Sequence, residues 1–288
     1  MIYDNTLFWE KYTKRDDDII IASTIKSGTT WLQQIVTQIV FEGKYEGKIT
    51  DISLWVDSQR TMNECKILEI IDNQTHRRIF KTHSMYDDVC VNMNEKNKYI
   101  FITRDFRDVV WSWFNHIQID PLKDIDELFG EVNKARDEKE LWDILMNTKH
   151  IFRSKSKKSM TWTYFDTVSS WIKRRDMNNV LIIHYNNLKQ DLDCCVKNIA
   201  RFLGYNHSDQ IIDDIVKHST FDWMKTSAEK YAPASFINKG TYRTFINKGI
   251  NKRWCDTLSE EDNKEYDDLL REFVDESYID WIKYGIMK

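Results

Sequence analysis

Five consecutive residues, Lys26 to Thr30, have the types needed to bind a phosphate-like anion and to help transfer it. They read Lys-Ser-Gly-Thr-Thr and lie between a β-branched run, Ile19 to Ala22, and a stretch with helical apolar spacing, Thr30 to Phe41. A loop in that position places backbone N–H groups and hydroxyls at the start of a helix, where unpaired donors and the helix dipole favour an anion. The sequence therefore predicts a strand, a phosphate-binding loop and a helix.

The order of residues in this loop differs from the Walker P-loop pattern G-x-x-x-x-G-K-[ST], in which the lysine follows the last glycine. Here Lys26 comes two residues before Gly28. A lysine that leads into the turn reaches toward the oxygen bridging the anion and its leaving group, so we expect transfer without a metal. The segment from Lys26 to Trp31 resembles the phosphosulfate loop of the cytosolic-type sulfotransferases, which use 3′-phosphoadenosine 5′-phosphosulfate (PAPS). Its entrance departs from that family, because Thr24-Ile25 stands in place of Tyr-Pro.

Composition limits the class of protein. The chain of 288 residues is 41% hydrophobic, with 11 Trp, 13 Tyr and 14 Phe, which is enough for a sizeable core. A net charge of −4 argues against a general nucleic-acid binder. The five cysteines have no C-x-x-C pair and no zinc spacing, so we expect a reducing compartment and neither a disulfide framework nor a metal centre.

The sequence carries no recognisable targeting or membrane signal. Residues 1–18 are polar and acidic, and no window approaches the roughly 18–20 apolar residues of a membrane span. Two prolines and eight glycines leave no linker rich in either residue. We therefore expect a cytoplasmic protein with one domain across residues 1–288 and no membrane partner.

Two further predicted strands end in side chains that can do chemistry. Lys81 and His83 close the run from residue 77 to 83, and Arg104 closes the run from 98 to 104. In an open parallel sheet, ligands bind beyond the carboxyl ends of the strands. Arg104 and Ser112, two turns into the next helix, can face one phosphate, because a guanidinium fork suits phosphate oxygens. The structural alternatives are an ion pair between Arg104 and Asp108 and a histidine without a catalytic role.

Both strand ends resemble segments of the same sulfotransferase family. Lys81-Thr82-His83 is similar to its Lys-Thr-His segment, which implies that His83 is the general base and that Lys81 binds the sulfuryl oxygens. The stretch after Arg104 resembles the 3′-phosphate segment, which implies that Arg104 and Ser112 contact that phosphate. The resemblance assigns the 5′-phosphate to the first loop, with contacts from Ser27, Gly28, Thr29 and Thr30.

Three aromatic residues are assigned to the adenine. The run from residue 179 to 185 is continuously apolar, as a strand covered on both faces should be. Tyr185 falls where the family has an adenine-contacting tyrosine, and Phe221 falls where an aromatic ring stacks on the base. Trp31 suits the other face, because aromatic planes pack well on a purine.

A segment near the C-terminus resembles the family's Arg-Lys-Gly-x-x-Gly-Asp-Trp stretch over the 3′-phosphate. It reads Asn247-Lys248-Gly249 and continues to Trp254, and the resemblance implies that Asn247, Lys248 and Gly249 bind the cofactor. Asn247 replaces the arginine, so one charged contact is lost.

Other departures affect this region. Arg243 and Arg253 are the candidates to replace the missing arginine, and Lys252-Arg253 takes the place of the Gly-Asp pair. The family's dimer motif is not recognisable from Cys255 to Lys264, which leaves both a monomer and a homodimer open.

The remaining elements are predicted by apolar spacing and caps. We expect three such segments: a short helix over 63–74, a helix over 187–205 that closes at Gly204, and an acidic amphipathic helix over 259–282 capped by Ser259. The stretch 43–59 is mixed in composition, and we describe it only as rich in loops.

Taken together, the sequence predicts an α/β fold with a single domain, a central parallel sheet flanked by helices and a P-loop-like phosphosulfate-binding loop. The predicted reaction moves the sulfuryl group from PAPS to a hydroxyl, or to an amine or guanidine nitrogen, of a small-molecule acceptor, and releases adenosine 3′,5′-bisphosphate (PAP). Acidic stretches at 51–57, 87–88 and 120–131 raise the hypothesis of a cationic acceptor. The alternatives are a catalytically inactive nucleotide-binding scaffold and a P-loop kinase, although the kinase's Gly-Lys-Ser/Thr ending and acidic magnesium residue are not evident.

Overall fold

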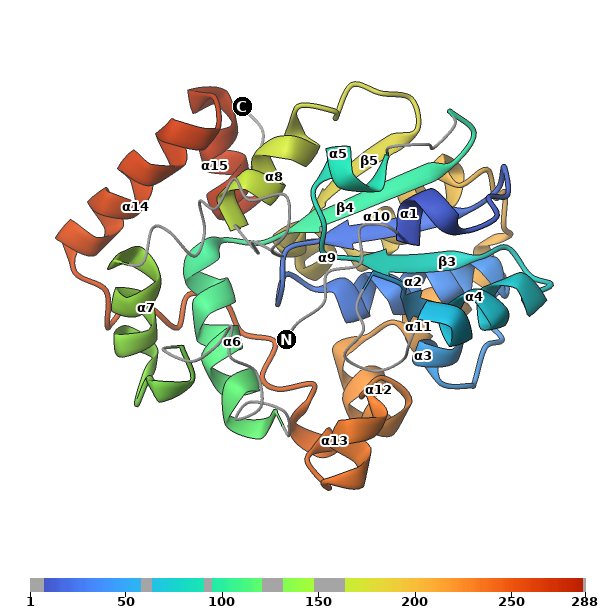
Figure 1. Cartoon of the computed structure of the whole chain (residues 1–288), viewed down its shortest axis with the longest axis horizontal. Helices are drawn as coiled ribbons and strands as arrows, with labels where there is room; N and C mark the ends of the chain where they lie inside the picture. The colour runs from blue at the N-terminus through green and yellow to red at the C-terminus, as the bar shows by residue number, and fades with distance from the viewer. Residues whose placement is uncertain (1–7, 58–63, 91–94, 121–131, 148–163, 287–288) are drawn as a thin grey trace.

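In residues 8–57, 64–90, 95–120, 132–147 and 164–286, which the computed structural model describes, five parallel strands form the central sheet (Figure 1). Each neighbouring pair is parallel. The strand order is β2-β3-β1-β4-β5. The strands are β1 Ile19–Ser23, β2 Ser53–Trp55, β3 Ile79–Thr82, β4 Lys98–Thr103 and β5 Val180–His184. The predicted α/β class with a central parallel sheet is confirmed.

Helices cover both faces of the sheet because the strands are apolar on both faces. Ile19 and Ile21 of β1 pack with α2 (Thr29–Val40), α10 (Leu192–Phe202) and α11 (Asp209–His218). Ile20 and Ala22 point to the opposite face, where a larger core includes residues of α8 (Tyr164–Ile172) and α14 (Glu260–Phe273). Figure 1 shows the two helical layers with the sheet between them.

The other helices extend these layers or border the sheet's carboxyl edge. They are α1 Phe8–Lys11, α3 Ile49–Ile52, α4 Glu64–Asn73, α5 Tyr86–Val89, α6 Phe106–Ile119, α7 Glu138–Asn147, α9 Tyr185–Gln190, α12 Phe221–Thr226, α13 Ala234–Asn238 and α15 Glu276–Tyr284, with short 3₁₀ turns at η2 Val132–Lys134, η3 Ala228–Lys230 and η4 Tyr242–Thr244. The short helix predicted over 63–74 is confirmed as α4. Among the described residues, none of these helices is both long and apolar enough to cross a bilayer.

Three predicted elements differ from the structure. The stretch 43–59 is not a loop alone but holds α3 and β2, and β2 has too few residues for a period to show. The predicted helix over 187–205 is two helices, because Asp191 has φ −150° and its side chain caps α10 by accepting from the Cys194 N–H at 2.9 Å. The predicted helix over 259–282 also divides, at Val274 and Asp275, although Ser259 caps α14 as predicted.

The order of the strands brings three carboxyl ends together. The chain leaves β1 to form β2 and β3 on one side, then crosses to form β4 and β5 on the other side. The carboxyl ends of β3, β1 and β4 are therefore neighbours at the point where the strand order reverses. Open α/β sheets bind their ligands at this point.

A buried ion pair fixes the opposite end of the sheet. Asp18 precedes β1 and Arg78 precedes β3, and both side chains are at most 1% exposed. Arg78 donates from Nε and Nη2 to the two carboxylate oxygens at 2.7 and 2.6 Å, and it also donates to the Thr13 carbonyl at 2.8 Å. A two-point contact of this kind sets the register of the two strands before they reach the reacting edge.

Replacing Asp18 with Asn should lower the free energy of unfolding by about 3–5 kcal/mol, because Arg78 would keep a buried charge without its counter-charge. Urea denaturation measures the change. Asp16→Asn is the matched control, since Asp16 pairs with Lys96 at 2.6 Å on the surface, where solvent screens the pair and the loss should be much smaller. Equal losses in the two variants would contradict the importance of the buried pair.

Candidate functional site

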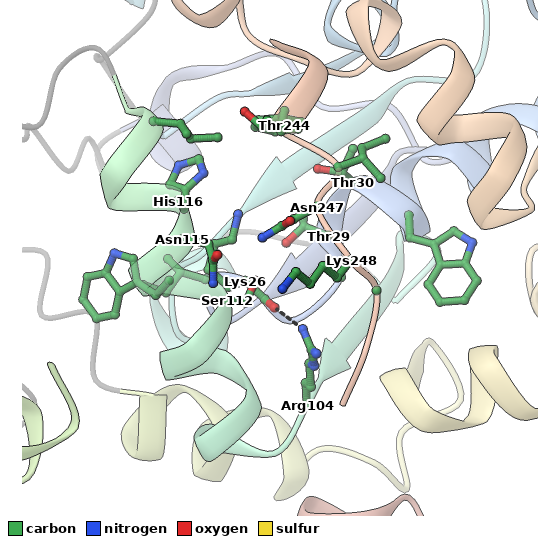
Figure 2. Close-up of a pocket in the computed structure, with 18 of the residues that line it drawn as sticks. Lys26, Thr29, Thr30, Arg104, Ser112, Asn115, His116, Thr244, Asn247 and Lys248 are labelled. Carbon is green, nitrogen blue, oxygen red and sulfur yellow. Dashed lines mark hydrogen bonds between the residues drawn. The ribbon is translucent and has the colours of Figure 1, made fainter. Parts of the chain in front are cut away.

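A cavity of about 590 Å³ lies at the carboxyl ends of the central strands. Its wall is formed by the loop after β1, the end of β3, helix α6 and the segment 244–253, and Figure 2 shows these parts converging on it. The predicted site residues that line it are Lys26, Gly28, Thr29, Thr30, Trp31, Lys81, His83, Arg104, Ser112, Tyr185, Phe221, Asn247, Lys248 and Gly249. The structure therefore brings together residues that are far apart in the chain, from Lys26 to Gly249.

The first loop turns sharply because two of its residues have left-handed backbone conformations. Lys26 has φ +57° and Gly28 has φ +105°. A Cβ at Gly28 would lie 2.8 Å from a ring carbon of Tyr185, so the loop needs a glycine for space as well as for conformation. Ser27 does not line the cavity, because its buried hydroxyl contacts the Thr24 hydroxyl. Its backbone amide remains the group that can serve an anion.

His83 is held as a neutral base. Its Nδ1 lies 2.9 Å from the Ser23 carbonyl oxygen, which can only accept a hydrogen bond, so Nδ1 carries the proton and Nε2 is the basic nitrogen of the ring. Burial, together with the nearby positive charge of Lys81, holds the pKa of His83 well below its usual range. The imidazole is therefore uncharged at neutral pH and able to take a proton.

The cations of the cavity crowd one another. Burial lowers the pKa of Lys26 to about 7, with further lowering from Lys81 and Arg104 and a smaller opposing effect from Asp120. Lys189 and Arg253 also line the wall, although the sequence did not single out Lys189. Asp120 is the one carboxylate among the described residues that line the cavity. Such a balance of charge suits a ligand with several negative charges.

Arg104 is poised to bind an anion. It is 5% exposed, it donates from Nη2 to the Asn251 side chain and the Ile250 carbonyl, and its guanidinium lies 4.3 Å from the Tyr185 ring centroid. The alternative ion pair with Asp108 is not formed in the described structure, where Asp108 accepts from the Lys252 N–H at 2.6 Å. No other described residue bonds the buried Nε of Arg104. An orphaned guanidinium donor of this kind marks a place for a phosphate oxygen.

A first group of aromatic side chains lines the cavity near the loop. The Trp31 and Tyr185 rings meet edge to face at 5.4 Å, and the Trp31 indole N–H donates to the Ser219 carbonyl at 2.7 Å. Phe221 lies against Gly249, where an added Cβ would come within 2.7 Å of its ring. The three rings predicted to contact a purine therefore do border one cavity.

A second group of aromatic side chains lines the same cavity, and the sequence did not predict its residues. His116 stacks on Phe236 at 5.2 Å and lies 5.9 Å from the Phe245 ring, while Trp55 and Trp113 continue the wall. These side chains come from separate elements, so no local motif could have identified them. They make a surface suited to a flat apolar molecule.

The three acidic stretches behave differently from one another. Asp57 is buried outside the cavity, where it accepts from Ser84 Oγ at 2.8 Å and from the Thr82 hydroxyl. Asp87 pairs with Arg174 at 3.3 Å on the surface. Asp120 lines the cavity, and the rest of its stretch, residues 121–131, lies outside the described residues. The hypothesis of a cationic acceptor therefore depends on Asp120 in the described structure.

Comparison with known proteins gives one consistent result. The family model for the sulfotransferase domain matches residues 16–278. Sulfotransferase 1B1 of the dog, Canis lupus familiaris, is 26% identical over 270 residues, which cover 90% of this chain and 83% of the relative. Mouse sulfotransferase SULT7A1 complexed with PAP superposes with a TM-score of 0.74 at 22% identity over 96% of this chain and 91% of its own. Retinol dehydratase in complex with androsterone and the inactive cofactor PAP gives 0.71 at 21% identity, over 96% and 87%. The two solved structures share this fold.

Lys26→Met should stabilise the ligand-free protein. With a pKa near 7 in the folded chain against 10.5 for a free lysine, the charge of Lys26 opposes folding fully below pH 7. That opposition weakens as the pH rises through 7 and is gone above about 10.5, when both states are neutral. Urea denaturation should show a gain of about 1 kcal/mol or more at pH 6 and a smaller gain at pH 9.

The exposed Lys44, whose side chain is 77% exposed, supplies the control. Lys44→Met should leave the stability unchanged to within about 0.5 kcal/mol at both pH values. A loss of stability in Lys26→Met at pH 6 would contradict the depressed pKa.

Proposed function

The chain belongs to the sulfotransferase domain family, and from this premise we propose that it transfers the sulfuryl group of PAPS to a small-molecule acceptor. The observation that carries the proposal is the neutral His83, which directs its Nδ1 proton to the Ser23 carbonyl and lines the same cavity as Lys26, Lys81 and Arg104. A base and an anion site in one cavity are the parts that such a transfer needs.

The loop after β1 would hold the 5′-phosphosulfate. Thr29 and Thr30 begin α2, so their backbone N–H groups and hydroxyls meet the positive end of that helix. The Thr29 hydroxyl also bonds Ser23 Oγ at 2.6 Å, which ties the loop to the strand that supports His83. Lys26 would neutralise the charge that builds on the bridging oxygen as PAP leaves.

The 3′-phosphate would bind between α6 and the segment after η4. Arg104, Ser112, Lys248 and Gly249 are the contacts inferred from the sequence, and all of them line the cavity. Phe221, Trp31 and Tyr185 would enclose the adenine. PAP in two proteins of the same fold supports this use of the cavity.

In the transfer, His83 would take the proton of the acceptor through Nε2, a role worth about 10²–10⁴-fold in rate. Lys81 would bind the sulfuryl oxygens while the bond from sulfur to the bridging oxygen of PAPS breaks and the bond from sulfur to the acceptor atom forms in line with it. Sulfuryl transfer, like phosphoryl transfer, passes through a loose transition state, so charge and position account for most of the acceleration. That no metal takes part remains a prediction from the sequence.

We infer that the acceptor is a small molecule with a flat apolar body and a hydroxyl, amine or guanidine nitrogen. The rings of Trp55, Trp113, His116, Phe236 and Phe245 support the apolar body. Asp120 supports a second candidate, an acceptor with a cationic group, because its carboxylate lines the same cavity, 3.9 Å from Nε2 of His116. We place the reaction in the cytoplasm.

Two other functions make different predictions for the same cavity. An inactive scaffold would bind PAP but transfer nothing. A P-loop kinase would prefer ATP with magnesium and would need a lysine after the last glycine of the loop, which here is followed by Thr29.

Transfer from ³⁵S-labelled PAPS to a panel of phenols, alcohols and amines tests the proposal directly. We expect turnover with at least one acceptor class, and we expect His83→Gln to lower kcat by about 10²–10⁴-fold while PAP still binds. PAP binding without turnover on any acceptor would favour the scaffold. Preference for ATP with magnesium would favour the kinase.

Arg253 should supply the charge that Asn247 lacks. Arg253 lines the cavity, and burial with the nearby charge of Arg104 lowers its pKa, whereas Arg243 is exposed and lies over the Tyr242 ring at 5.7 Å. Calorimetric titration should therefore show PAP affinity reduced about 10- to 100-fold in Arg253→Gln, the loss of about 1.5–3 kcal/mol expected for charged hydrogen bonds.

Adenosine 5′-monophosphate, which has no 3′-phosphate, serves as the matched ligand. Its affinity should be the same in wild type, Arg253→Gln and Arg104→Ala. Arg243→Gln should bind PAP as the wild type does, and a reduced affinity in that variant with none in Arg253→Gln would reverse the assignment.

A further inference from the structure

Trp55, the last residue of β2, lies directly beside the reacting groups. In the register of the sheet it is the partner of Lys81, and the Val56 N–H extends the pairing by donating to the Lys81 carbonyl at 3.3 Å. Partners on neighbouring strands project to the same face. The indole and the Lys81 side chain must therefore share the space at the carboxyl edge, next to His83.

The ring contacts both side chains at once. Lys81 Nζ lies 4.3 Å from the Trp55 ring centroid, within the range in which an ammonium is attracted to the face of an indole. The His83 ring lies 5.0 Å from Trp55 with an angle of 85° between the planes, which is an edge-to-face contact. One indole thus bridges the cation and the base.

The backbone that carries Trp55 is itself fixed. Two residues later, Asp57 is fully buried and accepts hydrogen bonds from the Thr82 hydroxyl, from Ser84 Oγ at 2.8 Å and from the Trp9 indole N–H at 3.3 Å. These bonds join the end of β2 to the end of β3. The ring of Trp55 therefore has a defined place relative to Lys81 and His83.

We propose that Trp55 is a positioning residue that holds the Lys81 ammonium beside His83, so that Lys81 meets the sulfuryl oxygens while His83 takes the proton of the acceptor through Nε2. The proposal rests on the proposed function for its catalytic meaning. The contact by which the indole holds the Lys81 ammonium in place is already present in the ligand-free protein.

The pKa of His83 reports the position of the Lys81 ammonium, because that charge lowers it. Burial is the largest cause that lowers the pKa of His83, and Lys81 at the end of β3 and Lys26 on the loop after β1 lower it further. Asp57, at the end of β2, is turned to the hydroxyls of Thr82 and Ser84. Loss of the indole frees the ammonium to move toward water and opens the imidazole to solvent, and both changes raise the pKa of His83.

The test is a histidine titration by NMR on the ligand-free protein, with the His83 signal identified by its loss in His83→Gln. In Trp55→Leu the pKa of His83 should rise by about half a unit or more, and in Trp55→Phe, which keeps a ring, by less. Trp223→Leu, which removes an exposed tryptophan outside the cavity, is the matched control and should leave it unchanged.

The same substitution in a Lys81→Met protein distinguishes two effects of Trp55 on His83: placing the Lys81 ammonium, and excluding solvent from the imidazole. In Lys81→Met, which has no ammonium to hold, adding Trp55→Leu should move the pKa of His83 by a smaller amount than it does in the wild type. Tetrafluorotryptophan at position 55 alone keeps the shape of the indole but weakens its attraction for cations. It should therefore raise the pKa of His83 in a protein that folds normally.

An unchanged pKa in both Trp55→Leu and the fluorinated protein, or an equal rise with and without Lys81, would overturn the proposal and leave Trp55 as part of the wall. Kinetics give an independent reading, since a positioning role lowers kcat to a similar extent for acceptors of different shape, whereas a wall contact changes KM for some of them. The NMR titration uses neither donor nor acceptor. An unchanged pKa of His83 would therefore contradict the role of Trp55, whereas a failure of PAPS to react would contradict the proposed function.

Discussion

Positive charge at the carboxyl edge of the sheet is the constraint on which the rest of this structure depends. Lys26, Lys81 and Arg104 approach one another inside a largely buried cavity, and in the described structure the one carboxylate on its wall is Asp120. Like charges in a desolvated space oppose folding, so other parts of the chain must hold them there. The apolar strands and the two helical layers supply that stability at a distance from the charges.

The opposite end of the sheet holds a buried arginine with a structural role, which can be compared with Arg104. Arg78 is as buried as Arg104, but it has Asp18 as a two-point partner and the Tyr12 ring 5.5 Å away. Arg104 instead has neutral partners and an Nε that no described residue bonds. The contrast distinguishes an arginine that fixes the fold from one that is kept available.

The sequence predicted the parts of the site that are encoded locally. The loop from Lys26 to Thr30, the strand ends at His83 and Arg104, and the helix that carries Ser112 are each defined by residues close together in the chain, and their strands and helices are where the sequence placed them. The second group of aromatic side chains on the cavity wall could not be predicted, because its members come from separate elements; Trp55, for example, meets Lys81 only through strand pairing. The sequence also did not predict the break at Asp191. The apolar residues of α9 and α10 continue one helical spacing across Asp191, so the residue that caps α10 does not interrupt the pattern.

The depressed pKa of Lys26 has a further consequence for how the cavity meets its ligand. Near neutral pH the empty protein carries this lysine only partly protonated, because burial and its cationic neighbours oppose the charge. A bound polyanion would reverse that balance, so the site would take up a proton from solution as the ligand binds and release it as the ligand leaves. Lys26 would therefore become fully protonated only when the ligand is bound. In the empty protein, its partial deprotonation reduces the repulsion among Lys26, Lys81 and Arg104.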